Sequence, residues 1–231
     1  MITMSSEAPL SKVIVALDCN NENDALEIAN LLDPKLCNLK IGLELFISCG
    51  PSIVKKIHNL NYKIFLDLKL HDIPNTVKKS IEGLSDLPIK MMTVHASGGL
   101  RMLQASVNAV KDTNIKIFGV TALTSLADED TQTIYRCNAK DQVLAMLELA
   151  MQSRIHGVVC SPHELSLVKN NSDLLTITPG IRIKSLGDDQ SRTMSPREAI
   201  GNGSNFLVIG RPITSSINIK NSLQEIYDSI Q

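Results

Sequence analysis

The sequence predicts an α/β protein with a (β/α)8 barrel, formed by residues 1–231 as a single domain. Eight short and nearly continuous apolar segments recur along the chain, as expected of parallel strands that are buried on both faces. Segments with helical spacing lie between them, and 231 residues is a normal length for one barrel. An open, doubly wound sheet is the alternative. The barrel is favoured because no glycine-rich fingerprint follows the first apolar segment.

The predicted elements alternate regularly along the chain. Residues 21–32 place their apolar side chains on one helical face, and Asn and Asp residues are available to cap the helix start. Residues 139–153 repeat that pattern, and residues 74–84 begin with proline, which is favoured in the first turn of a helix. The predicted strands are residues 13–18, 36–42, 63–69, 89–96, 116–123, 157–160, 174–180 and 206–210.

Composition excludes several classes of function. The chain carries 23 basic and 24 acidic residues and a net charge of −1, which gives no support for a nucleic-acid or membrane partner. The N-terminus lacks the basic and apolar regions of a secretory signal, and no apolar run approaches the ~20 residues of a membrane helix. The cysteines are scattered and none forms a CxxC pair. We therefore expect reduced thiols in a cytoplasmic protein, with neither a disulfide framework nor a zinc site.

Charged side chains stand at the ends of three predicted strands. Asp18 ends the first, Lys40 lies near the end of the second, and Asp67 and Lys69 end the third, with Asp72 just beyond. The C-terminal strand ends of a barrel meet at one mouth, so these charges can offset one another there. Each also has an ordinary explanation: Asp18 as a solvated strand end or a helix cap, Lys40 as an outward-pointing lysine, and Asp67 with Lys69 as a structural ion pair.

The loops after the seventh and eighth strands predict an anion site. Such loops often bind phosphate in barrels. In "VIGRPIT", Gly210 allows the backbone to approach an anion, Arg211 offers a forked donor, and Pro212 can open a helix. Arg182 and Gln190 lie on the preceding long loop. An ordinary tight turn at Gly210 is the alternative.

Several motifs together resemble one enzyme family. The D-x-K-x-x-D pattern of Asp67, Lys69 and Asp72, within "DLKLHDIPNT", is similar to the signature of orotidine 5′-phosphate decarboxylases. The similarity continues through "VALD", "LKIGLELF", "TVHASGG", "TALTS", "TPGIR" with "GDDQSR", and "VIGRPIT". The triplet alone is shared with relatives of that family, whereas the full ordered set is specific.

The resemblance implies decarboxylation of orotidine 5′-monophosphate to UMP, the last step of de novo pyrimidine nucleotide synthesis, without metal or organic cofactor. It implies that Lys69 donates a proton to C6, that Asp67 lies beside the substrate carboxylate, and that Lys40 binds ribose hydroxyls and holds Asp67. The implied catalytic residues are Lys69, Asp67, Asp72 and Lys40. His95 is left out of this set, since a histidine at a strand end is more often structural.

The same resemblance implies the rest of the nucleotide site and a homodimer. Asp72, with Ile73 and Thr76, would reach the active site of the partner subunit. The implied substrate-binding residues are Asp18, Lys40, Asp67, Asp72, Ile73, Thr76, Thr124, Ser125, Pro179, Arg182, Gln190, Gly210 and Arg211.

Two other functions compete with this interpretation. Metal-dependent sugar-phosphate decarboxylases and aldolases share the barrel and a similar motif, but they typically place an acidic metal ligand at the end of the second strand. Lys40 occupies that place here and would repel a cation. A non-catalytic phosphate-binding module is the second competitor, and it would have no need of Lys69.

Overall fold

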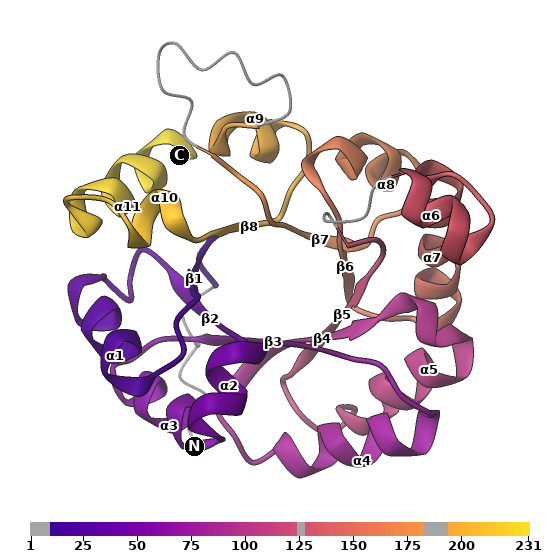
Figure 1. The fold of residues 1–231 in the computed structure, drawn as a ribbon, viewed down its shortest axis with the longest axis horizontal. Helices are drawn as coiled ribbons and strands as arrows, with labels where there is room; N and C mark the ends of the chain where they lie inside the picture. The colour runs from indigo at the N-terminus through magenta and orange to yellow at the C-terminus, as the bar shows by residue number, and fades with distance from the viewer. Residues whose placement is uncertain (1–9, 124–127, 183–193) are drawn as a thin grey trace, which may run out of the picture.

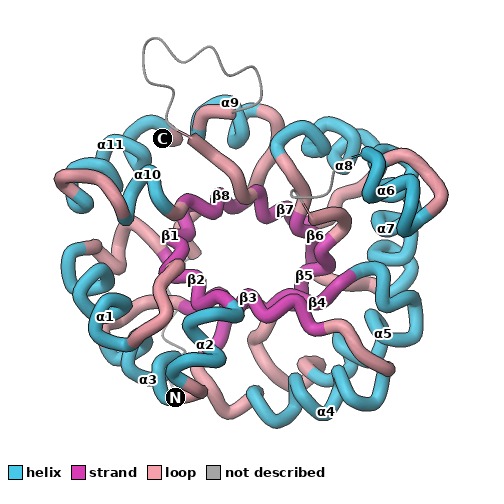
Figure 2. Tube along the Cα trace, in the orientation of Figure 1, coloured by secondary structure: helices cyan, strands magenta, loops and turns pink. Residues whose placement is uncertain are grey.

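The computed structural model describes residues 10–123, 128–182 and 194–231. In these residues eight parallel strands close into a barrel in the order β1 to β8. The barrel closes where β1 pairs with β8, with Val13 opposite Leu207 and Ile14 opposite Val208. Figure 1 shows the ring of strands with helices around its outside, and Figure 2 shows the same alternation along the chain. The predicted barrel class is confirmed, and the open sheet is wrong.

The strands are short, which is usual for a barrel. They are β1 Val13–Leu17, β2 Asn38–Gly42, β3 Ile64–Leu70, β4 Ile89–His95, β5 Lys116–Val120, β6 Gly157–Val159, β7 Leu175–Thr178 and β8 Phe206–Ile209. Seven of the eight predicted segments contain their strand in full, and the third falls one residue short of the end of β3 at Leu70. The fifth and seventh end sooner than predicted, because residues 121–123 and 179–180 already belong to loops that lead into the mouth.

The helices occupy the connections between strands. They are α1 Glu22–Leu31, α2 Leu43–Cys49, α3 Ser52–Asn59, α4 Pro74–Leu84, α5 Gly99–Ala109, α6 Asp128–Tyr135, α7 Ala139–Ser153, α8 Leu165–Asn171, α9 Pro196–Gly201, α10 Arg211–Thr214 and α11 Ile219–Ser229, with short 3₁₀ turns η1 Ala96–Gly98 and η2 Pro162–Glu164. The three helices predicted from sequence correspond to α1, α4 and α7. Asn21 caps α1 by accepting a hydrogen bond from the Asp24 N–H, and Pro74 opens α4.

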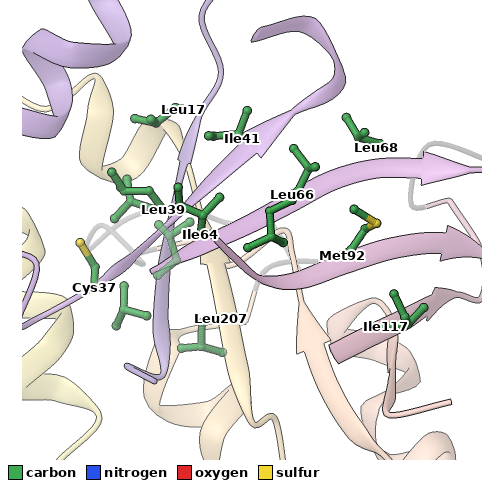
Figure 3. Packing of buried hydrophobic residues seen from close by; sticks show 14 of the residues in the cluster. Leu17, Cys37, Leu39, Ile41, Ile64, Leu66, Leu68, Met92, Ile117 and Leu207 are labelled. Carbon is green, nitrogen blue, oxygen red and sulfur yellow. The ribbon is translucent and has the colours of Figure 1, made fainter. Parts of the chain in front are cut away.

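Strand alternation divides the apolar residues between two cores. Side chains that point outward pack against the helices, and Figure 3 shows part of this outer core around Leu39, Ile64 and Leu66. Side chains that point inward fill the barrel, so the barrel is a packed core and not a channel. The buried members of this inner core are Ile14, Ala16, Phe65, Met91, Phe118, Ile177 and Val208.

The inner core determines where a site can form. It fills the middle of the barrel, so polar side chains that point inward from later positions on the strands are pushed to the C-terminal mouth. Lys40 and Asp67 are two such side chains, on β2 and β3. All five cysteines are free thiols. In the described part of the chain, no helix has the length and apolar character needed to cross a membrane. The expected cytoplasmic location stays a prediction.

Candidate active site

The C-terminal mouth of the barrel contains a pocket of about 680 Å³. Side chains from β1, β2, β3, β7 and the loop after β8 converge on it, although they are far apart in sequence. It is large enough for a small-molecule ligand. The predicted site residues that line it are Asp18, Lys40, Asp67, Lys69, Pro179, Arg182, Gly210 and Arg211.

Four charged side chains form an alternating chain at one side of this pocket. Lys40 Nζ lies 3.1 Å from Asp18 Oδ1 and 3.7 Å from Asp67 Oδ2, and Lys69 Nζ lies 2.8 Å from the same Asp67 oxygen. The side chains of Lys40 and Asp67 are each only 11% exposed. The predicted convergence of these charges is therefore confirmed. Each buried charge has an opposite charge beside it, which offsets the cost of removing it from water.

The outward-pointing interpretation of Lys40 and the helix-cap interpretation of Asp18 are wrong, although the Asp18 side chain is 60% exposed, as a solvated strand end would be. Lys40 is the third residue of the five-residue strand β2 and points into the mouth, so it is not an outward-pointing lysine. Asp18 does not cap α1, because Asn21 does so. The Asp67–Lys69 ion pair is real, but its Lys69 end is 36% exposed to the pocket. An ion pair that served stability alone would not need its ammonium group to face an open cavity.

Two glycines, which have no side chain, provide room for these charged groups. A Cβ atom on Gly42 would lie 3.0 Å from Lys40 Nζ, and a Cβ atom on Gly210 would lie 3.2 Å from Asp18 Oδ2. Both distances are tighter than ordinary carbon contacts. A side chain at either position would therefore displace a charged group of the mouth.

The end of β3 departs from regular strand geometry. Leu66 pairs with Met92 of β4 and Leu70 pairs with Val94, so four steps along β3 match only two along β4. Lys69, between the two pairs, has a backbone φ of +50°, in the left-handed region that most side chains avoid. Its N–H donates to Thr93 Oγ1 at 2.9 Å in place of a strand carbonyl. Such irregularities re-aim side chains and cluster at functional sites.

His95 lies at the end of β4, beside this irregular stretch. Burial lowers the pKa of His95, and the neighbouring His71 and Lys69 lower it further. The two imidazole rings have centroids 5.3 Å apart. The described residues that line the pocket do not include His95, which agrees with its omission from the predicted catalytic set.

The predicted anion site borders the same pocket, and its Gly210 lies next to Asp18. Arg182 follows β7, and Gly210 and Arg211 follow β8, so two arginines border the same cavity. The helix predicted there is present as α10, but it begins at Arg211, one residue before Pro212, and it has only four residues. The arginine side chains and the backbone near Gly210 are consequently the main donors available to an anion.

Among the described residues, three predicted site residues do not line this pocket. Asp72 and Ile73 lie between β3 and α4, Thr76 lies in the first turn of α4, and all three are exposed. Asp72 Oδ1 accepts a hydrogen bond from the Ile73 N–H at 2.7 Å. Thr124, Ser125 and Gln190 lie outside the described residues. In the described ranges, no group of three or more His, Cys, Asp or Glu side chains could hold a metal ion.

The sequence interpretation missed Thr93 and the apolar floor of the pocket. Thr93 is fully buried, and its hydroxyl donates to Asp67 Oδ1 at 2.8 Å. A polar residue at an inward position of β4, in step with Met91 and His95, was the available signal. The floor is supplied by inward side chains such as Phe65, Val120 and Ile177. No feature of the sequence separated these residues from the rest of the core.

Comparisons with known proteins match nearly the whole chain. The model of the orotidine 5′-phosphate decarboxylase / HUMPS family matches residues 11–226. The orotidine 5′-phosphate decarboxylase of Wolbachia sp. subsp. Brugia malayi (strain TRS) is 43% identical over 224 residues, which cover 96% of this chain and 100% of the relative. That of Legionella pneumophila (strain Corby) is 44% identical over 214 residues, which cover 90% of this chain and 93% of the relative.

A solved structure gives the same result. The crystal structure of orotidine 5′-phosphate decarboxylase from Lactobacillus acidophilus superimposes with a TM-score of 0.85 at 36% sequence identity. The match covers 96% of this chain and 99% of that chain. The likeness therefore extends over the whole barrel.

Proposed function

This chain belongs to the orotidine 5′-phosphate decarboxylase / HUMPS family, and from that premise we propose that its pocket converts orotidine 5′-monophosphate into UMP and carbon dioxide. This is the last step of de novo pyrimidine nucleotide synthesis. The observation that carries the proposal is the alternating chain Asp18, Lys40, Asp67 and Lys69 at the pocket wall. It directs a cation into the cavity and surrounds that cation with fixed countercharges.

Lys69 is the proton donor of the proposed reaction. When the bond between C6 and the carboxylate breaks, carbon dioxide leaves and the electron pair stays on C6. An ammonium group in the pocket stabilises this developing negative charge and then transfers a proton to the carbon. Lys69 Nζ is held at 2.8 Å from Asp67 and its side chain is partly open to the cavity, as this role requires.

Asp67 and Lys40 position that donor. Asp67 shares one oxygen between the ammonium groups of Lys69 and Lys40, and Lys40 in turn contacts Asp18. The four groups hold one another before substrate arrives, so little reorganisation is needed during the reaction. We assign the ribose hydroxyls to Lys40 and the ribose or pyrimidine side of the nucleotide to Asp18, and we place the departing carboxylate next to Asp67.

Arg182, Gly210 and Arg211 bind the phosphate of the proposed substrate, and Pro179 lines the pocket near the base. Two arginine side chains at one border of the cavity supply charge-assisted donors for a dianion. The phosphate is remote from the bond that breaks, so its binding energy serves to hold the base against Lys69. Three further assignments lie outside the described residues: Gln190 to the phosphate, and Thr124 and Ser125 to the nucleotide, with Ser125 at the pyrimidine edge.

The proposed active unit is a homodimer in which each site is shared. Asp72, Ile73 and Thr76 lie beyond the strand end and outside the pocket of their own chain, where a partner could receive them. Large apolar side chains are exposed nearby: Ile73 is 66% exposed, and Leu43 and Ile47 of α2 are 57% and 73% exposed. α2 lies against β3 at this end of the barrel (Figure 1). Exposed apolar groups of this kind favour burial in an interface.

The proposed reaction uses no metal ion. In the metal-dependent alternative, an acidic ligand would stand where β2 carries Lys40. Here the Lys40 ammonium lies between the carboxylates of Asp18 and Asp67, so it occupies the place where a cation would bind. The two positive charges would repel each other.

The decisive experiment measures the absorbance of orotidine 5′-monophosphate after purified protein is added with a chelator present. Loss of the orotidylate absorbance and formation of UMP are expected. Turnover that disappears with the chelator and returns with a divalent cation would favour the metal-dependent alternative. Binding of UMP without any turnover would favour the non-catalytic module.

A further inference from the structure

We propose that Thr93 is a positioning residue of the active site. Its hydroxyl joins the Asp67 carboxylate to the backbone of Lys69, and so it fixes the direction in which the Lys69 ammonium enters the pocket. This inference rests on the proposed function, because it assigns Thr93 a part in the same reaction. Thr93 acts through Asp67 and Lys69 and does not itself line the pocket.

The first argument is the hydrogen bonding of the Thr93 side chain. Oγ1 donates its one proton to Asp67 Oδ1 at 2.8 Å and accepts the Lys69 N–H at 2.9 Å. The residue is 0% exposed, so water has no access to replace either bond. A hydroxyl can donate and accept at the same time, which few small side chains can do.

The second argument is the geometry of β3. A residue with a side chain is strained at the φ of +50° that Lys69 adopts, and the strand pairing is interrupted there. The interruption removes the usual strand acceptor for the Lys69 N–H, and Thr93 supplies one instead. Thr93 therefore holds the backbone conformation from which the Lys69 side chain turns back toward Asp67.

The third argument is that the two carboxylate oxygens of Asp67 have different partners. Oδ2 faces the two ammonium groups, at 2.8 Å from Lys69 and 3.7 Å from Lys40. Oδ1 is held by Thr93 alone among the hydrogen bonds of the described residues. Without that bond the carboxylate would be free to rotate, and the ammonium that it orients would follow.

The test compares Thr93→Val, which keeps the shape and removes the hydroxyl, with Thr93→Ser, which keeps the hydroxyl. Thr93→Val should lower kcat by about 10- to 100-fold, or about 1.4–2.7 kcal/mol at 1.36 kcal/mol per factor of ten. Its affinity for UMP should stay within about threefold, and Thr93→Ser should stay within about threefold of wild type in both. A split between turnover and binding, with rescue by serine, is the signature of positioning.

A matched control separates positioning from a general loss of stability. Thr176 of β7 is also 0% exposed. Its hydroxyl accepts the Asn205 N–H at 3.1 Å, and its proton is within reach of the Gly203 carbonyl at 3.2 Å and Asn205 Oδ1 at 3.1 Å. Thr176→Val likewise removes a buried hydroxyl that donates and accepts, near the N-terminal end of a strand. It should lower the melting temperature and leave kcat unchanged.

Each outcome decides the inference. Turnover of Thr93→Val within threefold of wild type, or a Thr93→Ser loss as large as that of Thr93→Val, would overturn it. If Thr93→Val does not fold, Thr93→Cys against Thr93→Ser gives the same comparison, because these differ only in sulfur for oxygen and the thiol is a weak hydrogen-bonding group. A wild-type protein without turnover would overturn the proposed function together with this inference. Normal wild-type turnover with undiminished variants would overturn the inference alone.

Discussion

The ammonium nitrogen of Lys69 lies 2.8 Å from a carboxylate oxygen of Asp67, two residues earlier on the same strand. In a regular strand, residues two apart share a face but their side chains run side by side. Here the left-handed backbone of Lys69 and the interrupted pairing of β3 bring the two charges into contact. The contact leaves the ammonium partly open to the pocket and holds it at one place.

Replacement of Lys69 by alanine should abolish turnover and spare nucleotide binding. The ammonium acts mainly on charge that develops in the transition state, so its loss should lower kcat by at least about a thousandfold. UMP affinity should change much less, because Asp67 keeps its contact with Lys40. Turnover and UMP binding are measured separately. Lys56→Ala, which removes an ion pair with Glu22 outside the pocket, is the control. A kcat of Lys69→Ala within tenfold of wild type would rule out the proton-donor role.

Replacement of Arg211 by alanine should lower kcat/KM for the nucleotide far more than kcat/KM for the nucleoside. A charge-assisted contact to phosphate contributes about 1.5–3 kcal/mol, so kcat/KM for orotidine 5′-monophosphate should fall by about 10- to 150-fold. Orotidine lacks the phosphate, so kcat/KM for orotidine should change little. Arg197 of α9 donates to the Ser229 carbonyl outside the pocket, so Arg197→Ala should affect both substrates equally and slightly. Equal losses with Arg211→Ala would mean that Arg211 supports the fold.

Replacement of Gly157 by alanine should destabilise the barrel. A Cβ atom there would lie 2.5 Å from the Leu175 carbonyl oxygen and 2.5 Å from the Phe118 ring, inside a closely packed interior. Overpacking of this kind costs about 1–3 kcal/mol. Gly119→Ala is the matched control, since its Cβ would meet only ordinary contacts at 3.5 and 3.6 Å. Urea unfolding measures both, and equal free energies of unfolding would contradict the packing argument.

Local patterns in the sequence were sufficient to predict the barrel. Each strand is buried, so its residues form a short apolar run in the sequence. The charged residues at the C-terminal ends of the first three runs indicated side chains at the mouth. Asn21 and Pro74 could be recognised as helix starts because capping depends on neighbouring residues alone. Asp18, Lys40, Asp67 and Lys69 could be grouped because parallel strands bring their C-terminal ends to one edge.

The features that escaped prediction depend on distant contacts. The left-handed backbone of Lys69 depends on Thr93, which is 24 residues away and reaches it only through the pairing of β3 with β4. A threonine inside an apolar strand carries no local sign that its hydroxyl serves another strand. The length of α10 was likewise not readable from "GRPIT", because the chain turns away after one helical turn. The expected sharing of the site between two subunits stays a prediction, because it concerns a second chain.

The last prediction concerns that second chain. Asp67 and Lys69 line the pocket of their own barrel, whereas Asp72 is exposed in the turn before α4 and does not. A two-fold interface is isologous, so each subunit would give its Asp72 to the other. Lys69→Ala and Asp72→Asn should each be inactive as homodimers. In a mixed dimer one site would contain both substitutions. The other site would combine the wild-type Lys69 of one chain with the wild-type Asp72 of its partner.

Mixing equal amounts of the two inactive variants should therefore restore activity. Random exchange makes about half of the dimers mixed, and each mixed dimer has one intact site of two, so about a quarter of wild-type activity is expected. Subunit exchange is verified independently with labelled protein, and each variant is also mixed with itself as the control for the mixing step. With exchange confirmed, a mixture as inactive as its parents would show that Asp72 serves its own chain, because only a residue contributed across the interface can be complemented in this way.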